Sequence, residues 1–136
     1  MSGRVRGPTL MRVRVENFGG IVALEKPALL VLADRALMRE MGREGGDQWS
    51  ENPSIGLLSG PVEVHLSITN FCSNGCRHCY SDSVPAPVGR ATVDQLKERV
   101  DQLHRMGAFH IALGGGEPFT FDGLFELAAH IREKGM

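Results

Sequence analysis

The stretch VEVHLSIT, residues 62–69, decides the fold class, because it opens a regular alternation of strands and helices. Its apolar side chains stand at every second position, which predicts a strand with one buried face. A second strand is predicted over 109–113, where a short apolar run is typical of a strand covered on both faces. The apolar face of the first strand carries Val62, Val64, Leu66 and Ile68.

Two amphipathic helices are predicted to alternate with these strands. The first spans 92–106, where apolar residues recur every three or four positions, and Thr92 with Gln95 matches a capping box. The second spans 123–134, with Asp122 as its N-cap. The order strand, helix, strand, helix predicts an α/β fold with parallel strands.

The first part of the chain has a different pattern. Residues 10–16 predict a strand, and the apolar runs 21–24 and 28–32 predict a hairpin. Asp34 is placed to cap a short helix that ends near Met41.

Residues 42–54 are polar and contain glycine, which is typical of a linker. Trp49 either anchors this linker against a core or contacts a partner. We therefore expect a small β-hairpin, helix and linker segment over 1–55 and a second domain over 56–136.

Charge and hydropathy exclude several classes of function. The 15 basic and 16 acidic residues leave a formal net charge of −1, so the chain does not resemble a nucleic-acid binder. Its longest apolar run, Pro27 to Ala33, is far shorter than the ~20 residues of a membrane span. We expect a soluble, cytoplasmic protein that binds neither nucleic acid nor membrane.

All three cysteines lie in the stretch CSNGCRHC, residues 72–79, directly after the first predicted strand. Three cysteines so close together are not a disulfide framework, and soft thiolates bind zinc, copper(I) or an iron–sulfur cluster. A 4Fe–4S cluster on three cysteines leaves one iron free of protein ligands. The alternatives are zinc, with His78 or a remote histidine as fourth ligand, and buried cysteines without metal.

The stretch GGGEP, residues 114–118, follows the second predicted strand. Glycines there let a ligand approach the backbone, and the run fits neither of the common nucleotide-binding glycine motifs. Glu117 either receives a positively charged group or faces water. Because neighbouring parallel strands end side by side, we expect this turn and the cysteine stretch to border one cavity.

Together these motifs resemble the radical S-adenosylmethionine (radical SAM) superfamily. Cys72, Cys76 and Cys79 match its triple-cysteine signature, with His78 where that signature usually has an aromatic residue. The run from Gly115 to Pro118 matches its GGEP motif. The resemblance covers about residues 62–136 and implies the first βα units of a partial (β/α) TIM-type barrel.

The resemblance implies an oxidoreductase with two cofactors, a 4Fe–4S cluster and S-adenosyl-L-methionine. The three cysteines would be the metal ligands. The cluster would take an electron from a flavodoxin- or ferredoxin-type donor, and cleavage of the cofactor would yield a 5′-deoxyadenosyl radical that abstracts hydrogen from substrate. The implied cofactor-binding residues are His78, Tyr80, Gly115, Gly116, Glu117 and Pro118.

Residues 10–41 are similar to the N-terminal segment of radical SAM enzymes that mature ribosomally made peptides, of the SPASM type. The edge of this small sheet either takes a peptide by strand addition or only packs on the barrel. The chain ends where a third strand of the barrel is due, so we expect a truncated core. The alternatives are a zinc-binding interaction module and an inactive truncated relative.

Overall fold

A computed structural model of the chain describes residues 9–51, 57–86 and 89–136. Its contacts divide the chain into two compact units, Met1–Ser59 and Gly60–Met136. Each unit has its own sheet and its own apolar core. The boundary that we predicted between residues 55 and 56 lies outside the described residues.

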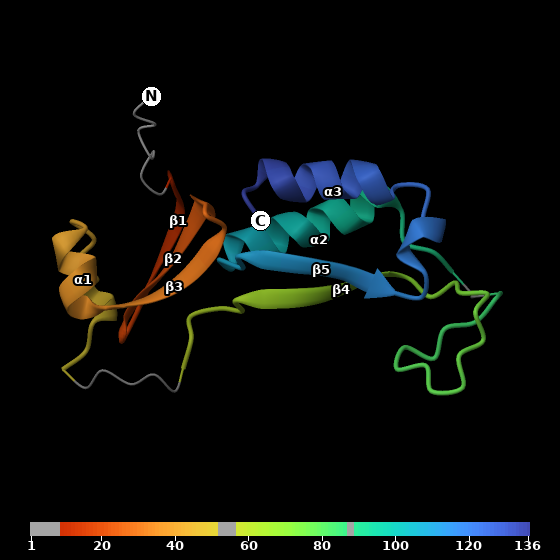
Figure 1. The fold of residues 1–136 in the computed structure, drawn as a ribbon, viewed down its shortest axis with the longest axis horizontal. Coiled ribbons are helices and arrows are strands. Elements are labelled where there is room, and N and C mark those ends of the chain that lie inside the picture. Colours follow the sequence, from red (N-terminus) through yellow and green to blue (C-terminus); the bar gives the residue numbers. More distant parts are fainter. Residues whose placement is uncertain (1–8, 52–56, 87–88) are drawn as a thin grey trace, which may run out of the picture. The chain divides into compact units, whose positions relative to one another are not determined.

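The first unit is an antiparallel three-stranded sheet with one short helix (Figure 1). Each strand follows the last through a tight turn, so the order β1-β2-β3 is also the order along the chain. Asp34 caps the helix as predicted, because its Oδ1 accepts a hydrogen bond of 2.8 Å from the Leu37 amide. The elements are β1 (Thr9–Glu16), β2 (Gly19–Lys26), β3 (Leu29–Asp34) and α1 (Arg35–Glu40).

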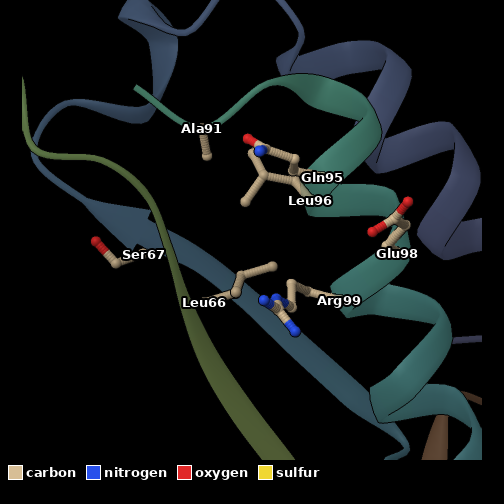
Figure 2. Close-up of a pocket in the computed structure, with 7 residues that line it drawn as sticks. All are labelled: Leu66, Ser67, Ala91, Gln95, Leu96, Glu98 and Arg99. Carbon is tan, nitrogen blue, oxygen red and sulfur yellow. The ribbon is translucent and has the colours of Figure 1, made fainter. Parts of the chain in front are cut away.

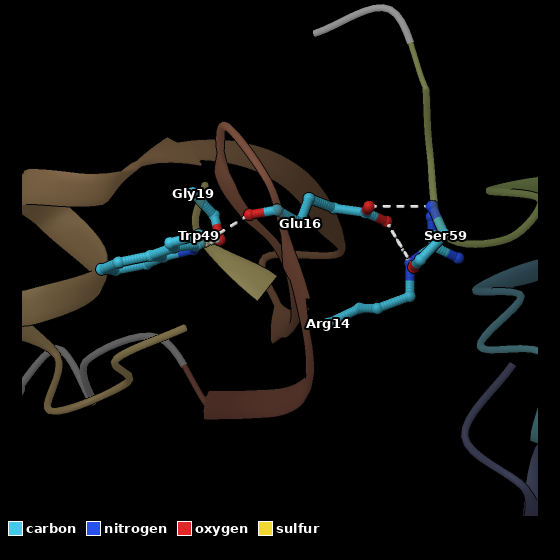
Figure 3. Close-up of polar contacts among 5 residues, drawn as sticks. All are labelled: Arg14, Glu16, Gly19, Trp49 and Ser59. Atoms are coloured by element: carbon cyan, nitrogen blue, oxygen red, sulfur yellow. Dashed lines mark hydrogen bonds and ion pairs between the residues drawn. The ribbon is translucent and has the colours of Figure 1, made fainter. Parts of the chain in front are cut away.

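A buried carboxylate and a tryptophan hold the end of this unit against its sheet (Figure 3). Glu16 is only 2% exposed, and it accepts hydrogen bonds from Arg14 Nε at 2.7 Å and from both the amide and the hydroxyl of Ser59. The indole of Trp49 donates to the carbonyl oxygens of Glu16 and Gly19, at 3.0 and 3.3 Å. Of the two roles considered for Trp49, the structure shows the anchor.

The second unit is the α/β arrangement that the alternation predicts. β4 (Glu63–Thr69) and β5 (His110–Gly115) pair in parallel, and α2 (Val93–Arg105) and α3 (Leu124–Glu133) lie along the pair in Figure 1. Burial alternates along β4, as its sequence predicts, and the apolar side chains of that strand pack with both helices. The buried core is Ile68, Leu96, Val100, Ile111, Leu124, Leu127 and Ile131.

The two helix starts of this unit differ. The capping box predicted for α2 is present, with Gln95 N donating to Thr92 Oγ1 at 3.2 Å and Thr92 N donating to the Gln95 side chain at 2.9 Å. The cap predicted for α3 is wrong, because its N-cap is Gly123 and no side chain bonds there. The turn before α3 holds a short 3₁₀ helix, Pro118–Thr120, and the chain around Gly123 packs tightly enough to favour glycine.

The predicted linker is more ordered than its composition indicates. It contains a 3₁₀ helix, Gly46–Gln48, beside the anchored Trp49. Among the described residues, none of the helices has the length and apolar character needed to cross a membrane.

Candidate functional site

The loop that carries the three cysteines, residues 70–84, is called the cysteine loop, and the GGGEP stretch, residues 114–118, is called the glycine turn. The two meet at the carboxyl ends of β4 and β5. Two backbone hydrogen bonds join them: Gly116 N donates to Thr69 O at 2.7 Å, and Glu117 N donates to Phe71 O at 2.9 Å. Parallel pairing places the two strand ends side by side, so chain segments about 40 residues apart come together. The two stretches therefore lie side by side at this edge of the sheet, and the cavity that we expect between them stays a prediction.

The loop that carries the cysteines closes on itself. Cys72 N donates to Val84 O and Val84 N donates to Asn70 O, both at 3.1 Å, so the two ends of the loop form a short ladder. Gly75, between the first two cysteines, has a φ of 58°, which glycine adopts without strain. The sequence between these ends is thus held as a protrusion beyond β4.

The three thiols are free and lie on this one protrusion. Cys72 and Cys79 are half-buried and Cys76 is exposed. In the described parts of the chain, no three histidine, cysteine or acidic side chains converge as ligands of one metal ion. The structure therefore supplies the donors on a single loop without gathering their sulfurs at one point.

Serine side chains connect the third cysteine to the glycine turn. Ser81 Oγ lies 3.3 Å from Cys79 Sγ, donates to Gly115 O at 2.8 Å and lies 2.7 Å from Ser83 Oγ. The pKa of Cys79 is lowered to about 7, first by the Ser81 hydroxyl and then by bonds with the Ser83 and Ser81 backbones. A thiol with this pKa is about half thiolate at neutral pH, and the thiolate is the form that binds metals.

The glycines of the turn are required by packing between the strands. A Cβ on Gly116 would overlap the carbonyl oxygen of Phe71, and one on Gly115 would overlap Ser67 and Thr69. Gly115 also has a φ of 105°. The sequence predicts that these glycines let a ligand approach the backbone. The structure shows that they also let β4 and its loop pack closely against the turn.

Glu117 and Pro118 form the exit from the turn. Glu117 Oε1 accepts a hydrogen bond of 3.2 Å from Phe119 N and so caps the 3₁₀ helix that Pro118 begins. The half-buried carboxylate has further lone pairs that can accept additional donors. The hydrogen bond from the backbone N–H of Glu117 to the carbonyl oxygen of Phe71 holds Glu117 beside the cysteine loop.

Tyr80 and His78 lie on the exposed part of the loop. Tyr80 is 77% exposed, and its hydroxyl lies 3.4 Å from His65 Nε2, with ring centroids 5.8 Å apart. His65 belongs to β4, where a histidine among apolar neighbours is typically structural. The structure places it beside Tyr80 and against Gly114, on the face of β4 opposite the apolar core. The period-2 alternation of β4 is the signal that indicates this face.

A separate pocket of about 530 Å³ lies between β4 and α2 (Figure 2). It contains none of the predicted site residues, and its polar groups come from α2 and the strand rather than from the cysteine loop. We therefore place the candidate site at the two loops and not in this pocket. The lining residues are Leu66, Ser67, Ala91, Gln95, Leu96, Glu98 and Arg99.

Comparison with known proteins adds family and fold. Residues 66–135 match the family model described as the Radical SAM superfamily. The chain is 34% identical over 70 residues to the mycofactocin maturase MftC of Mycobacterium tuberculosis, which is 52% of this chain and 18% of that protein. It is 30% identical over 83 residues to the AdoMet-dependent heme synthase of Methanosarcina barkeri, which is 60% of this chain and 24% of that protein.

Among solved structures, Streptococcus suis SuiB bound to its precursor peptide SuiA is similar over 93% of this chain and 40% of SuiB, with a TM-score of 0.63 and 16% identity. SuiB bound to S-adenosylmethionine is similar with a TM-score of 0.62, 16% identity, and coverage of 92% of this chain and 38% of SuiB. The chain thus spans less than a fifth of MftC, about a quarter of the heme synthase and two fifths of SuiB.

Proposed function

Because the chain belongs to the radical SAM superfamily, we propose that it holds a 4Fe–4S cluster on Cys72, Cys76 and Cys79 and binds S-adenosylmethionine at the turn after β5. The observation that carries this proposal is the joining of the cysteine loop to the glycine turn through the amides of Gly116 and Glu117. We propose further that β4, α2, β5 and α3 are the first units of a partial (β/α) barrel, within a domain over 56–136 that follows a small N-terminal domain over 1–55.

The donor set suits a cluster better than a single zinc ion. A structural zinc ion takes four protein ligands, and this loop offers three cysteines. In a cubane cluster each cysteine binds a different iron, so the sulfurs need only lie around a larger body. Three free thiols on one glycine-containing loop fit that requirement, and Cys79 is already biased toward thiolate.

Cys72, Cys76 and Cys79 would hold the cluster, which when bound would supply the electron for reductive cleavage of S-adenosylmethionine and so for hydrogen abstraction from the substrate. The chain's own part is to bind and orient. The carboxylate of Glu117 and the backbone of Gly115 and Gly116 receive the ammonium end of the cofactor, and Pro118 stiffens the turn that presents them.

The aromatic residues of the loop serve the other end of the cofactor. His78 and Tyr80 carry flat rings next to the third cysteine, and both lie exposed enough to reach a bound adenine. The bond of Tyr80 with His65 gives its ring one defined position over β4. We expect an external flavodoxin- or ferredoxin-type donor and a cytoplasmic location, where thiols stay reduced.

We propose a ribosomally made peptide as the substrate class. The SuiB structure is similar over 93% of this chain and was solved with a precursor peptide bound, whereas the heme synthase is similar over 83 residues. The first unit offers a route for binding a peptide: β3 is an edge strand of its sheet. An extended peptide can add to such an edge through backbone hydrogen bonds. Its exposed apolar side chains are Leu29, Leu30 and Leu32, at 50, 47 and 69%.

The first experiment is anaerobic reconstitution of the chain with iron and sulfide, followed by metal analysis. We expect about four irons per chain and no retained zinc. Cys76→Ala should lose the cluster, because each remaining cysteine binds only one iron, whereas Ser73→Ala in the same exposed loop should load iron like the parent. Reduction in the presence of S-adenosylmethionine should then release 5′-deoxyadenosine from the parent and from Ser73→Ala, but not from Cys76→Ala.

Zinc without iron uptake would contradict the proposal and support an interaction module. Full iron loading without cleavage would contradict the enzymatic part alone and indicate an inactive relative.

The substrate class is tested separately, by selecting binders from a displayed random peptide library and by titrating the chain with haem. Peptides should be enriched, and Leu30→Asp with Leu32→Asp on β3 should abolish their binding while iron loading stays unchanged. Exposed Glu51→Gln is the control for surface change in this unit. Tight haem binding with no enriched peptide would reverse the assignment.

A further inference from the structure

The side chain of Ser81 contacts both halves of the candidate site. Its hydroxyl lies 3.3 Å from Cys79 Sγ and bonds to Gly115 O at 2.8 Å. The first contact belongs to the cysteine loop and the second to the glycine turn, 34 residues further along the chain. A half-buried serine thus spans the two stretches that the motifs describe separately.

The hydroxyl has a single hydrogen to share between these partners. With Gly115 O as acceptor, Cys79 must donate its own S–H to Ser81 Oγ. A sulfur bound to iron carries no hydrogen and can only accept. Ligation of Cys79 therefore makes its sulfur and Gly115 O compete for the same serine hydrogen.

The neighbouring serine is coupled to this competition without removing it. Ser83 Oγ lies 2.7 Å from Ser81 Oγ and 3.1 Å from Asn70 Oδ1. Ser83 donates to Asn70, so it can donate to Ser81 only by giving up that bond, and Ser81 still donates to only one of its two partners. The pair forms a short relay of hydroxyls between the end of β4 and the glycine turn.

We propose that Ser81 is a positioning residue that hydrogen-bonds the sulfur of Cys79 when it is a cluster ligand and ties the position of Gly115 to that bond. This inference rests on the proposed function, since it needs a cluster on the loop. Hydrogen bonds to the ligand sulfurs of an iron–sulfur cluster raise its reduction potential. Loss of the Ser81 hydroxyl should therefore lower the potential where its hydrogen lies on the sulfur, and loosen the glycine turn where it lies on Gly115 O.

The test compares Ser81→Ala, Ser81→Val and Ser81→Thr in the reconstituted chain, with Ser73→Ala as the control from the same loop. Spectroelectrochemistry measures the midpoint potential, and equilibrium dialysis measures binding of S-adenosylmethionine. We expect Ala and Val to shift the potential to more negative values and to weaken cofactor binding about fivefold. Threonine keeps the hydroxyl and the size of valine, so Ser81→Thr should behave like the parent.

Unchanged potentials in Ser81→Ala and Ser81→Val, with about four irons bound, would overturn the inference and leave the proposed function intact. Equal changes in the Val and Thr variants would overturn it too, because they would show an effect of size. If Ala and Val fail to load iron while Thr loads it, the hydroxyl is required to build the site, which supports the inference. Failure of the parent to load iron would contradict the proposed function and, with it, this inference.

Discussion

The two sheets of this chain differ in the direction of their strands and in the connections between them. In the first unit β1, β2 and β3 follow one another through tight turns, and pair antiparallel with their sequence neighbours. In the second unit β4 and β5 pair in parallel, so the chain must travel from the end of one strand back to the start of the next through a long loop and α2. Only the second arrangement brings two distant loops to the same edge.

Polar side chains have different tasks in the two units. Glu16 and Trp49 tie the end of the first unit to its own sheet (Figure 3). In the second unit Ser81 and the amides of Gly116 and Glu117 tie one loop to another. This difference predicts that removing a polar contact from the first unit lowers its free energy of unfolding. Removing one from the second unit should instead separate the two loops of the candidate site.

The largest effect is expected for Gly116→Ala, which disturbs the two backbone hydrogen bonds between the glycine turn and the chain at the end of β4. Its Cβ would overlap the Phe71 carbonyl, a backbone atom that cannot turn away, so we expect a cost of about 3 kcal/mol. Hydrogen exchange at the amides of residues 116 and 117 should accelerate roughly a hundredfold, and iron loading should fall.

The matched control is Gly114→Ala, where the obstacle is the movable ring of His65. We expect less than about 1 kcal/mol for this variant. Equal losses in the two variants would show that the backbone contact at Phe71 does not hold the loops together.

A smaller effect is expected for Glu16→Gln in the first unit. The Glu16 carboxylate accepts three hydrogen bonds from Arg14 and Ser59. The NH₂ of a glutamine would face one of these donors and could not accept its bond, so the free energy of unfolding should fall by about 2 kcal/mol. Denaturation followed through Trp49, the only tryptophan of the chain, measures this unit. Exposed Glu44→Gln should leave the midpoint unchanged, and an unchanged midpoint in Glu16→Gln would show that the buried carboxylate adds nothing.

The smallest effect concerns pH and the contact between α2 and α3. The pKa of Asp101 is lowered from its ordinary 3.8 by hydrogen bonds from Lys134, first, and from His130. A lowered carboxylate pKa stabilises the folded state above the ordinary value, and this contribution disappears as the pH falls through the folded value. Stability should therefore decline below about pH 4.

Asp101→Asn should flatten that decline slightly, in urea midpoints measured across the acidic range. Asp94→Asn, on the exposed surface of the same helix, is the control and should follow the parent curve. Parallel curves for all three proteins would show that the Asp101 contacts are too solvated to matter.

Much of the fold follows from local patterns. The alternation along β4, the capping box at Thr92 and the cap at Asp34 are contacts between residues close in sequence, and the structure confirms each of them. The α3 start failed at Asp122 because the preceding turn folds into a 3₁₀ helix, which moved the N-cap to Gly123. Gly123 lies close to Val93 of α2 and to Phe121, so packing as well as cap preference acts at this position.

Sequence alone determined which residue types stand in the candidate site, because the triple-cysteine stretch and the GGEP stretch are each contiguous and each follows a predicted strand. Tertiary structure decided how these stretches are joined, and it brought in Ser81, His65 and Trp49 through contacts 15 to 34 residues apart. Such contacts depend on the parallel register of β4 and β5 or on the way a polar loop returns to its sheet. No local pattern encodes these contacts, because the secondary-structure propensity of a serine or a histidine does not depend on whether a hydrogen-bond partner lies across the sheet.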